Sequence, residues 1–314
     1  MKGFLIAVPL LLLPEIAAIS FPPDQSTEPK DICASKTSAQ PEWRTVTAVS
    51  GQVDMAFIAG ATFQMGVAAE DLQRLQEFFE IKDPRFFDPE VPKHTVTIDS
   101  FYLDKRLVTN EEFEKFTREN PSWHADRIPA KFHNGHYLEH WNANGAPPER
   151  AKHPVVNVSW HAAVAYCQWE GKRLPTEAEW EFAAKGRLNG VFPWGDEAAN
   201  QQMANYARSG IRTTTAVGSY PANGYGLFDM AGNVWEYLAD EWAPYRSDAQ
   251  TNLVAGGDYF ASGDSYQRVT TRRVIRGGSW GGSPVNLWVE YRDSHPPNNA
   301  KDFVGFRCAR TATK

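Results

Sequence analysis

Hydrophobic and polar residues alternate over short stretches near the start of the chain, a pattern typical of β-strands. The segment MAFIAGATFQMG at 55–66 predicts two strands around a turn at Gly60. Residues 91–98 and 101–103 predict a second pair of strands, and residues 72–79 between the two pairs predict a short helix. We therefore expect this part of the chain to form small strand pairs.

Three helices are predicted in the middle of the chain, and each begins at a residue that can cap its first turn. The segments TNEE at 109–112 and TEAE at 176–179 are capping boxes, in which the Thr side chain and the Glu side chain each bond the other residue's amide. Ser159 can cap the helix between them. Gly171 and Gly186 are expected to end the second and third helices.

The C-terminal stretch 273–310 combines strand-like runs with turns. A short strand at 274–275 is predicted to break at the two glycines 277–278. The β-prone run at 287–291 and the alternating run at 304–308 predict two further strands.

The distribution of these elements indicates the fold class. The predicted helices lie in the first half of the chain, whereas the second half is rich in turns, and its polar stretch at 243–270 predicts a surface excursion. The sequence has no internal repeat. We expect a single α+β domain with a high content of loops.

The N-terminus has the pattern of a secretory signal. Lys2 precedes an apolar run from Phe4 to Leu13, and the small residues Ala17, Ala18 and Ser20 follow. The run is too short for a spanning helix, although a retained membrane anchor is the alternative interpretation. We expect a secreted or periplasmic protein without a stable membrane anchor. The expected division of the chain is a signal peptide at 1–20, a flexible leader at 21–52 and a folded domain at 53–314.

Composition narrows the choice of partners. The formal net charge is -6 and no long basic run is present, so nucleic acid is not an expected partner. The three cysteines are Cys33, Cys167 and Cys308. In an oxidising compartment they predict one disulfide and one remaining thiol, and these counts leave the pairing open.

The loop at 229–236 offers oxygen ligands of the kind that calcium prefers. Asp229 and Glu236 supply carboxylates, and the carbonyls of Gly232 and Val234 could face inward from a tight turn. The alternative is that these are ordinary turn and surface residues, which the spacing alone favours.

Other motifs give weaker indications of chemistry. His133, His136 and His140 suggest a metal site, but Asn134 and Gly135 interrupt a helix there, so histidines with local bonds are favoured. A hydrolytic triad of Ser279, Asp293 and His295 is disfavoured, because crowding in one segment does not establish its geometry. The sequence contains no nucleotide-binding loop and no G-x-S-x-G elbow.

Ordered motifs from about residue 53 to the C-terminus resemble the formylglycine-generating enzymes, also called sulfatase-modifying factors. The matching segments include FQMG at 63–66, HPVVNVSW at 153–160, AYC at 165–167, GKRLPTEAEWE at 171–181, FPWG at 192–195, NGYGL at 223–227, GNVWE at 232–236, RGGS at 276–279 and GFRC at 305–308. The resemblance implies one compact domain related to C-type lectins, with little regular secondary structure.

The resemblance also implies a disulfide and a structural calcium site. It pairs Cys167 with Cys308, which leaves Cys33 free, and it places calcium at the positions of Asp229, Gly232, Val234 and Glu236. A second calcium site of the family matches only in part, at Asn205 and Tyr206, and we expect that site to be lost.

Catalytic members of the family use two cysteines that hold copper(I) and convert a substrate cysteine to formylglycine with oxygen. The first of these positions is Gly282 here, and the second falls at or beside Leu287. No substitute thiol lies nearby in the sequence, and soft thiolates are what hold copper(I), so we do not expect a copper cofactor. Whether another redox metal binds is left open.

The resemblance leaves two functions to distinguish. One is oxidative maturation of a peptide or peptide-like substrate, as in branches that mature a siderophore chromophore. The other is binding without catalysis, as in the cysteine-free paralogue and the lectin-like variable proteins. The expected site residues are Ser279, His295 and Glu290 for catalysis, with Asp293 as a further base, and Trp280, Trp288, Tyr291 and Arg292 for substrate binding.

Overall fold

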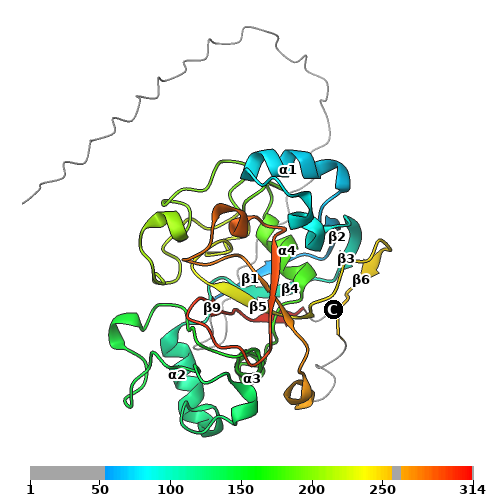
Figure 1. Ribbon diagram of the computed structural model, residues 1–314. Coiled ribbons are helices and arrows are strands. Elements are labelled where there is room, and N and C mark those ends of the chain that lie inside the picture. The colour runs from blue at the N-terminus through cyan, green and yellow to red at the C-terminus, as the bar shows by residue number, and fades with distance from the viewer. Residues whose placement is uncertain (1–53, 257–262, 313–314) are drawn as a thin grey trace, which may run out of the picture. The chain divides into compact units, whose positions relative to one another are not determined.

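The structure, a computed structural model, describes residues 54–256 and 263–312. It is a mixed α and β structure in which short elements alternate with long loops (Figure 1). The helices are α1 (Leu72–Phe79), α2 (Asn110–Glu119), α3 (Trp160–Trp169) and α4 (Glu177–Lys185). The strands are β1 (Met55–Ile58), β2 (Ala61–Met65), β3 (His94–Ile98), β4 (Phe101–Asp104), β5 (Trp235–Glu241), β6 (Gln250–Thr251), β7 (Arg273–Arg276), β8 (Arg292–His295), β9 (Val304–Gly305) and β10 (Ala309–Thr311).

The expected signal peptide at 1–20 and leader at 21–52 lie outside the described residues, and so does Cys33. Among the residues that are described, no helix combines the length and apolar character needed to span a bilayer.

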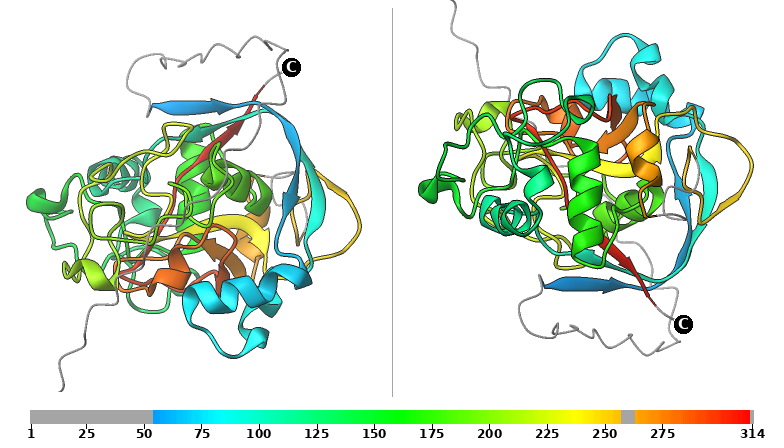
Figure 2. Two further views of the ribbon diagram at one scale, coloured as in Figure 1. Left: turned by 90° about the horizontal axis from the view of Figure 1, so that it is seen from above. Right: turned by 90° about the horizontal axis from the view of Figure 1, so that it is seen from below.

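The strands form three small sheets, in the orders β1-β4-β10, β2-β3-β6 and β8-β7-β5-β9. All four early strands exist, but they do not pair with their neighbours in the chain as expected. β1 pairs with β4, and β2 pairs with β3, so the turn at Gly60 joins two sheets. A Cβ atom at Gly60 would lie 2.7 Å from the carbonyl oxygen of Ile98, which explains the glycine. Figure 2 shows β1 (blue) and β10 (red) at the same side of the molecule.

The three predicted helix starts are confirmed. At Thr109 and Thr176 both bonds of the capping box are present, and Ser159 Oγ accepts a bond from the amide of Ala162. These local bonds satisfy amides that have no partner inside the helix, which is why the sequence alone located them.

The strand predicted at 287–291 is wrong. Residues Pro284–Leu287 form a 3-10 helix instead, and the next strand starts at Arg292. Ser283 caps this turn reciprocally with Asn286, and Pro284 has the fixed φ that suits a first helical position. Leu287 and Trp288 are both buried, so the run does not present the alternating faces of a half-buried strand.

The final strand is divided into two. β9 covers only Val304–Gly305, and β10 begins at Ala309. Between them Arg307 is fully buried, and its guanidinium binds Glu236 at the start of β5. The stretch expected as a surface excursion includes a buried residue, Tyr266, although residues 257–262 within it lie outside the description.

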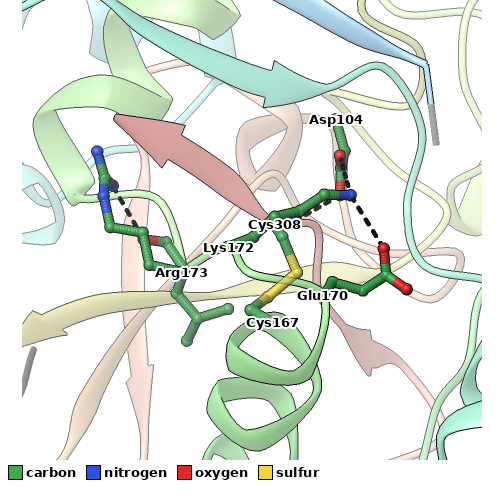
Figure 3. The surroundings of a disulfide bond; sticks show 7 residues. Asp104, Cys167, Glu170, Lys172, Arg173 and Cys308 are labelled. Atoms are coloured by element: carbon green, nitrogen blue, oxygen red, sulfur yellow. Dashed lines mark hydrogen bonds and ion pairs between the residues drawn. A yellow bond between two sulfur atoms is a disulfide. The ribbon is translucent and has the colours of Figure 1, made fainter. Parts of the chain in front are cut away.

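A disulfide joins Cys167 on α3 to Cys308 beside β10, with the two Cα atoms 5.6 Å apart (Figure 3). The pairing implied by the family resemblance is thus present. Next to it, the buried ammonium of Lys172 lies 3.0 Å from Asp104 on β4, and Asp104 accepts a bond from the amide of Cys308. The crosslink and this ion pair together fix the C-terminal strand to the core.

Candidate functional site

The loop that carries Ser279 folds against the loop that carries Asp229. The amide of Gly232 donates to the carbonyl of Gly277, and the amide of Trp280 donates to the carbonyl of Asn233. Gly278 has φ 73°, and a Cβ there would lie 2.7 Å from the carbonyl oxygen of Asn286. The close approach of these segments therefore requires glycine at this position.

A groove of about 560 Å³ is lined in part by residues 283–286, which follow Gly282 in the chain. One wall is the turn 283–286, and the other comes from the end of α1 and from Pro84–Glu90, a 3-10 helix that follows it. Only two side chains of the lining, Glu80 and Arg208, carry a charge. The aromatic lining residues are Phe78, Phe79, Phe86, Phe192 and Tyr291.

The rings of the groove support each other but leave apolar surface open to solvent. Phe86 lies 5.8 Å from Tyr291 between ring centroids, and Phe78 lies 6.0 Å from Phe192. Phe78 and Phe86 are nevertheless 39% and 38% exposed, which is unusual for residues of this type. An aromatic hollow with so much open apolar surface is suited to binding a ligand.

The expected site residues do not converge on this groove. Tyr291 lines it, and Ser279 lies close by in the chain, buried and without a hydrogen bond from its hydroxyl to any described residue. Trp280 is half-buried and donates its indole N–H to the carbonyl of Asp302. His295 bonds the side chain of Asn299, and burial lowers its pKa.

Arg292 and Trp288 are both buried, and neither lines the groove. Both oxygens of Glu177 accept bonds of 2.8 Å from Arg292, whose guanidinium also lies over the ring of Tyr245. Trp288 is 2% exposed and packs between Phe79 and Phe87. Glu290 lines a different hollow, where its carboxylate lies 3.2 Å from the ammonium of Lys185.

A buried ion network stands behind these residues. Arg276 binds Glu177 at 3.0 Å and Glu181 at 2.7 Å, and Glu181 also binds Lys185 at 2.8 Å. Each of these charges has an opposite partner, as burial in a region of low dielectric requires. The network explains why Arg292 and Arg276 are present without assigning either one to a substrate.

The loop at 229–236 has features that fit a calcium ion. Oδ2 of Asp229 accepts a bond of 2.7 Å from the amide of Gly218, whereas the buried Oδ1 has no hydrogen-bond partner among the described residues. Burial, together with the nearby charge of Glu236, raises the pKa of Asp229 to about 6. A cation at this point would give the orphan oxygen a partner and would offset the repulsion between the two carboxylates.

Glu236 is already held by Arg307, at 2.7 and 2.9 Å, so the second carboxylate is oriented before any ion binds. Gly232 (φ 81°) and the fully buried Val234 lie in the same turn. Carboxylate and carbonyl oxygens together form a donor set that suits calcium.

The histidines of the middle segment bond locally. His124 contacts Asp126 and His136 contacts Glu139, while His140 bonds the side chain of Asn110. Within residues 54–256 and 263–312, no three His, Cys, Asp or Glu side chains form a group that could hold a metal ion. A calcium site with only two carboxylates would not form such a group.

Comparison with known proteins identifies the family. The family model described as sulfatase-modifying factor enzyme 1-like domain matches residues 42–312. The chain belongs to this family. The formylglycine-generating enzyme of Thermomonospora curvata is 32% identical over 305 residues, covering 81% of this chain and 92% of the relative. The mouse formylglycine-generating enzyme is 32% identical over 266 residues, covering 71% and 69%.

A third relative of this sulfatase-modifying-factor-like chain is named as inactive. It is the inactive C-alpha-formylglycine-generating enzyme 2 of Bos taurus, 31% identical over 304 residues and covering 83% of this chain and 89% of the relative. The family therefore includes members named as catalysts and members named as inactive.

Solved structures agree with the loop-rich α+β fold of this family member. Treponema denticola variable protein 1 has a TM-score of 0.62 at 25% identity, covering 87% of this chain and all of that chain. PvdO from Pseudomonas aeruginosa has a TM-score of 0.59 at 24% identity, covering 83% and 95%. The expected fold class is thus confirmed.

Sequence reasoning missed the aromatic wall supplied by the end of α1 and by Pro84–Glu90. The adjacent pairs Phe78–Phe79 and Phe86–Phe87 stand in an otherwise polar stretch, and they were the available signal. One ring of each pair is more than a third exposed, which the sequence does not reveal.

Proposed function

We propose that this chain is an extracytoplasmic protein that binds a peptide or peptide-like substrate in the aromatic groove and takes part in its oxidative maturation. The observation that carries the proposal is the position of the groove. The groove is lined by residues 283–286, which directly follow the loop of Ser279 and Gly282 in the chain. The family resemblance implies that the reaction occurs at that loop. Its lining favours a substrate that presents aromatic or aliphatic side chains.

The same position argues against copper chemistry of the cysteine-pair type. Gly282 has no side chain, and Leu287 offers only hydrocarbon and is 1% exposed. Copper(I) is held by soft thiolates. Cys308 lies in the disulfide with Cys167, so its sulfur is already bonded.

Calcium has a structural role in this proposal. Asp229, Gly232, Val234 and Glu236 would hold it, and the ion would fix the loop whose carbonyl at Asn233 receives the amide of Trp280. The bound ion supplies charge neutralisation. The chain's own residues supply the groove and the hydrogen bonds that connect it to this loop.

Binding without catalysis is the second candidate function. Neither His295 nor Glu290 is among the residues that line the groove, so the expected bases do not face a ligand bound there. Among the described lining residues Glu80 is the only carboxylate, and Tyr291, Ser283 and Asn286 can contact a ligand but do not accept a proton at neutral pH.

Oxygen uptake separates the two candidates. The purified mature protein is incubated with candidate peptides from its own secretome, and dissolved oxygen and peptide mass are followed together. Maturation predicts oxygen uptake that depends on peptide, with a matching mass change in the peptide. Peptide binding by calorimetry without either change favours the accessory role, and no binding of any peptide contradicts both.

A further inference from the structure

A second hollow, of about 400 Å³, lies beside the start of α1, and its residues differ from those of the aromatic groove. Its walls come from several separate parts of the chain: the end of β2 and the residues after it, the start of α1, the end of α4 with the turn around Gly190, and the segment that carries Trp288 and Glu290. It is large enough for a small organic ligand. It is more highly charged than the groove: its lining includes Asp71, Arg74, Lys93, Lys185, Asp196 and Glu290, whereas the groove has Glu80 and Arg208.

The floor of this hollow is a buried ammonium between two carboxylates. Lys185 Nζ donates to Glu181 at 2.8 Å, to the carbonyl of Gln64 at 3.1 Å, and approaches Glu290 Oε1 at 3.2 Å. The ammonium is therefore held by two hydrogen bonds and by an ion pair with Glu290. Lys185 is therefore not available to a ligand, whereas the carboxylate of Glu290 is.

Glu290 lines the hollow with a carboxylate that is partly exposed. Its Oε1 lies 3.2 Å from the ammonium of Lys185, and the side chain is 16% exposed, so a ligand in the hollow can reach the carboxylate. Glu181 does not need Glu290 as a companion, because Lys185 and Arg276 already compensate its charge. The pKa of Glu290 is raised by burial and by repulsion from Glu181, so a cation that binds here would stabilise its ionised form.

The remaining walls complete a site for two opposite charges. Arg74 on α1 is exposed and has no ion-pair partner among the described residues. It lines the same hollow as Glu290 and can meet a carboxylate. Val67, Leu75 and Trp288, which are 4%, 2% and 2% exposed, also line the hollow, and their apolar edges suit a short aliphatic side chain.

We propose that this hollow binds a free aliphatic α-amino acid, with the ammonium group on Glu290 and the carboxylate on Arg74. The ammonium bonds the carboxylate of Glu290, and the aliphatic side chain packs on Leu75 and Val67. This site lies apart from the groove and does not depend on the function proposed for the groove. Because α1 lines both hollows, a bound amino acid would also stabilise the position of the aromatic residues that α1 contributes to the groove.

The test uses the full mature chain with L-leucine and two analogues that each lack one charge. N-acetyl-L-leucine has no ammonium group, and L-leucinamide has no carboxylate. Calorimetry and thermal unfolding are measured for the wild type, Glu290→Gln, Arg74→Ala and the control Arg85→Ala. Arg85 is exposed and pairs with Asp83 outside the hollow.

Leucine is expected to bind and to raise the melting temperature, and each analogue to bind at least about tenfold more weakly, since each loses a charged hydrogen bond. Glu290→Gln and Arg74→Ala should each weaken leucine binding by a similar factor, whereas Arg85→Ala leaves it unchanged. Arg74 is exposed, so its substitution tests the site even if Glu290→Gln folds poorly. Absence of leucine binding at millimolar concentration, or binding that survives both substitutions, overturns the proposal.

Discussion

At Asp229 one carboxylate oxygen is hydrogen-bonded and the other is buried without a partner, which makes this residue the sharpest test of calcium binding. A chelator should lower the melting temperature, because an ion at about one hundred times its dissociation constant contributes about 2.7 kcal/mol. In a domain of this size that corresponds to roughly 5–10 °C.

The matched variant for this prediction is Asp229→Asn. It removes the charge that the ion compensates, so the chelator effect should largely disappear. Metal analysis by mass spectrometry of the untreated protein provides the direct check. An unchanged melting temperature in chelator together with no bound calcium would refute the site.

A second prediction at the residue scale concerns Glu90, which is fully buried. Oε1 of Glu90 accepts a hydrogen bond from the amide of Arg292, whereas Oε2 has no hydrogen-bond partner among the described residues. Burial raises the pKa of Glu90 to about 8. The folded state therefore binds a proton more tightly than the unfolded state does. Stability from this group is complete below the unfolded pKa of about 4.3 and is lost as the pH rises toward 8.

Denaturant unfolding between pH 5 and pH 8.5 measures this dependence. Glu90→Gln keeps the shape and hydrogen-bonding capacity of the neutral acid but does not titrate, so its stability should fall less with rising pH. Asp104, Asp229 and Asp240 also have raised pKa values, and they contribute the same background slope to both proteins. Equal slopes for the two proteins would show that Glu90 is ionised in the folded state.

At the scale of elements, the disulfide between Cys167 and Cys308 connects α3 to the last strand. A crosslink that closes a loop of 141 residues stabilises mainly by restricting the unfolded chain, by about 3–5 kcal/mol. The double variant Cys167→Ser with Cys308→Ser should lose that amount in denaturant unfolding, while Cys33→Ser should lose none. Peptide mapping without reductant gives an independent check, and a fragment linking Cys33 to either partner would contradict the assignment.

The aromatic wall formed by α1 and Pro84–Glu90 should determine peptide binding more than stability. Phe86 is 38% exposed, so Phe86→Ala removes groove surface while leaving the buried ring of Phe87 in place. We expect peptide affinity to fall by about 1–2 kcal/mol and stability by less, as measured by calorimetry and unfolding. Leu188→Ala, at a residue 60% exposed and outside the groove lining, is the control and should change neither.

Elements were predictable where their cause is local. The capping boxes at Thr109 and Thr176 involve residues three apart, and both were located from the sequence. The strand predicted at 287–291 was wrong because this segment is buried by residues distant in the chain, including Phe79 and Phe87. The predicted strand pairing was also wrong, because β1 pairs with β4, more than forty residues away in the chain, and not with its neighbour β2.

At the scale of the whole molecule, the same limit applies to the candidate site. The family resemblance indicated the fold and the disulfide because both are carried by ordered motifs along the chain. It could not show that Arg292 forms an ion pair with Glu177, or that Glu290 forms one with Lys185, because the two residues of each pair are more than one hundred positions apart in the chain. The proposed groove and amino-acid hollow likewise depend on which faces of α1 the fold leaves open.

The last prediction combines these scales. We expect no conversion of a sulfatase-type cysteine peptide to formylglycine, even with added copper(I) and oxygen. Gly282 and Leu287 cannot hold copper(I), and the sulfurs of Cys167 and Cys308 are bonded to each other. Cys33 lies outside the described residues, so the Cys33→Ser variant is assayed in parallel to exclude any contribution from that thiol.

The assay follows the peptide aldehyde by mass spectrometry, with an active formylglycine-generating enzyme as the positive control. Peptide binding is measured on the same samples, because the aromatic groove is intact whether or not copper binds. Binding without aldehyde is the expected outcome, since recognition depends on the groove and the reaction depends on the thiolates. Aldehyde above the no-enzyme control in the Cys33→Ser protein would mean that the chain oxidises cysteine without a thiolate pair, and would restore the oxidase assignment.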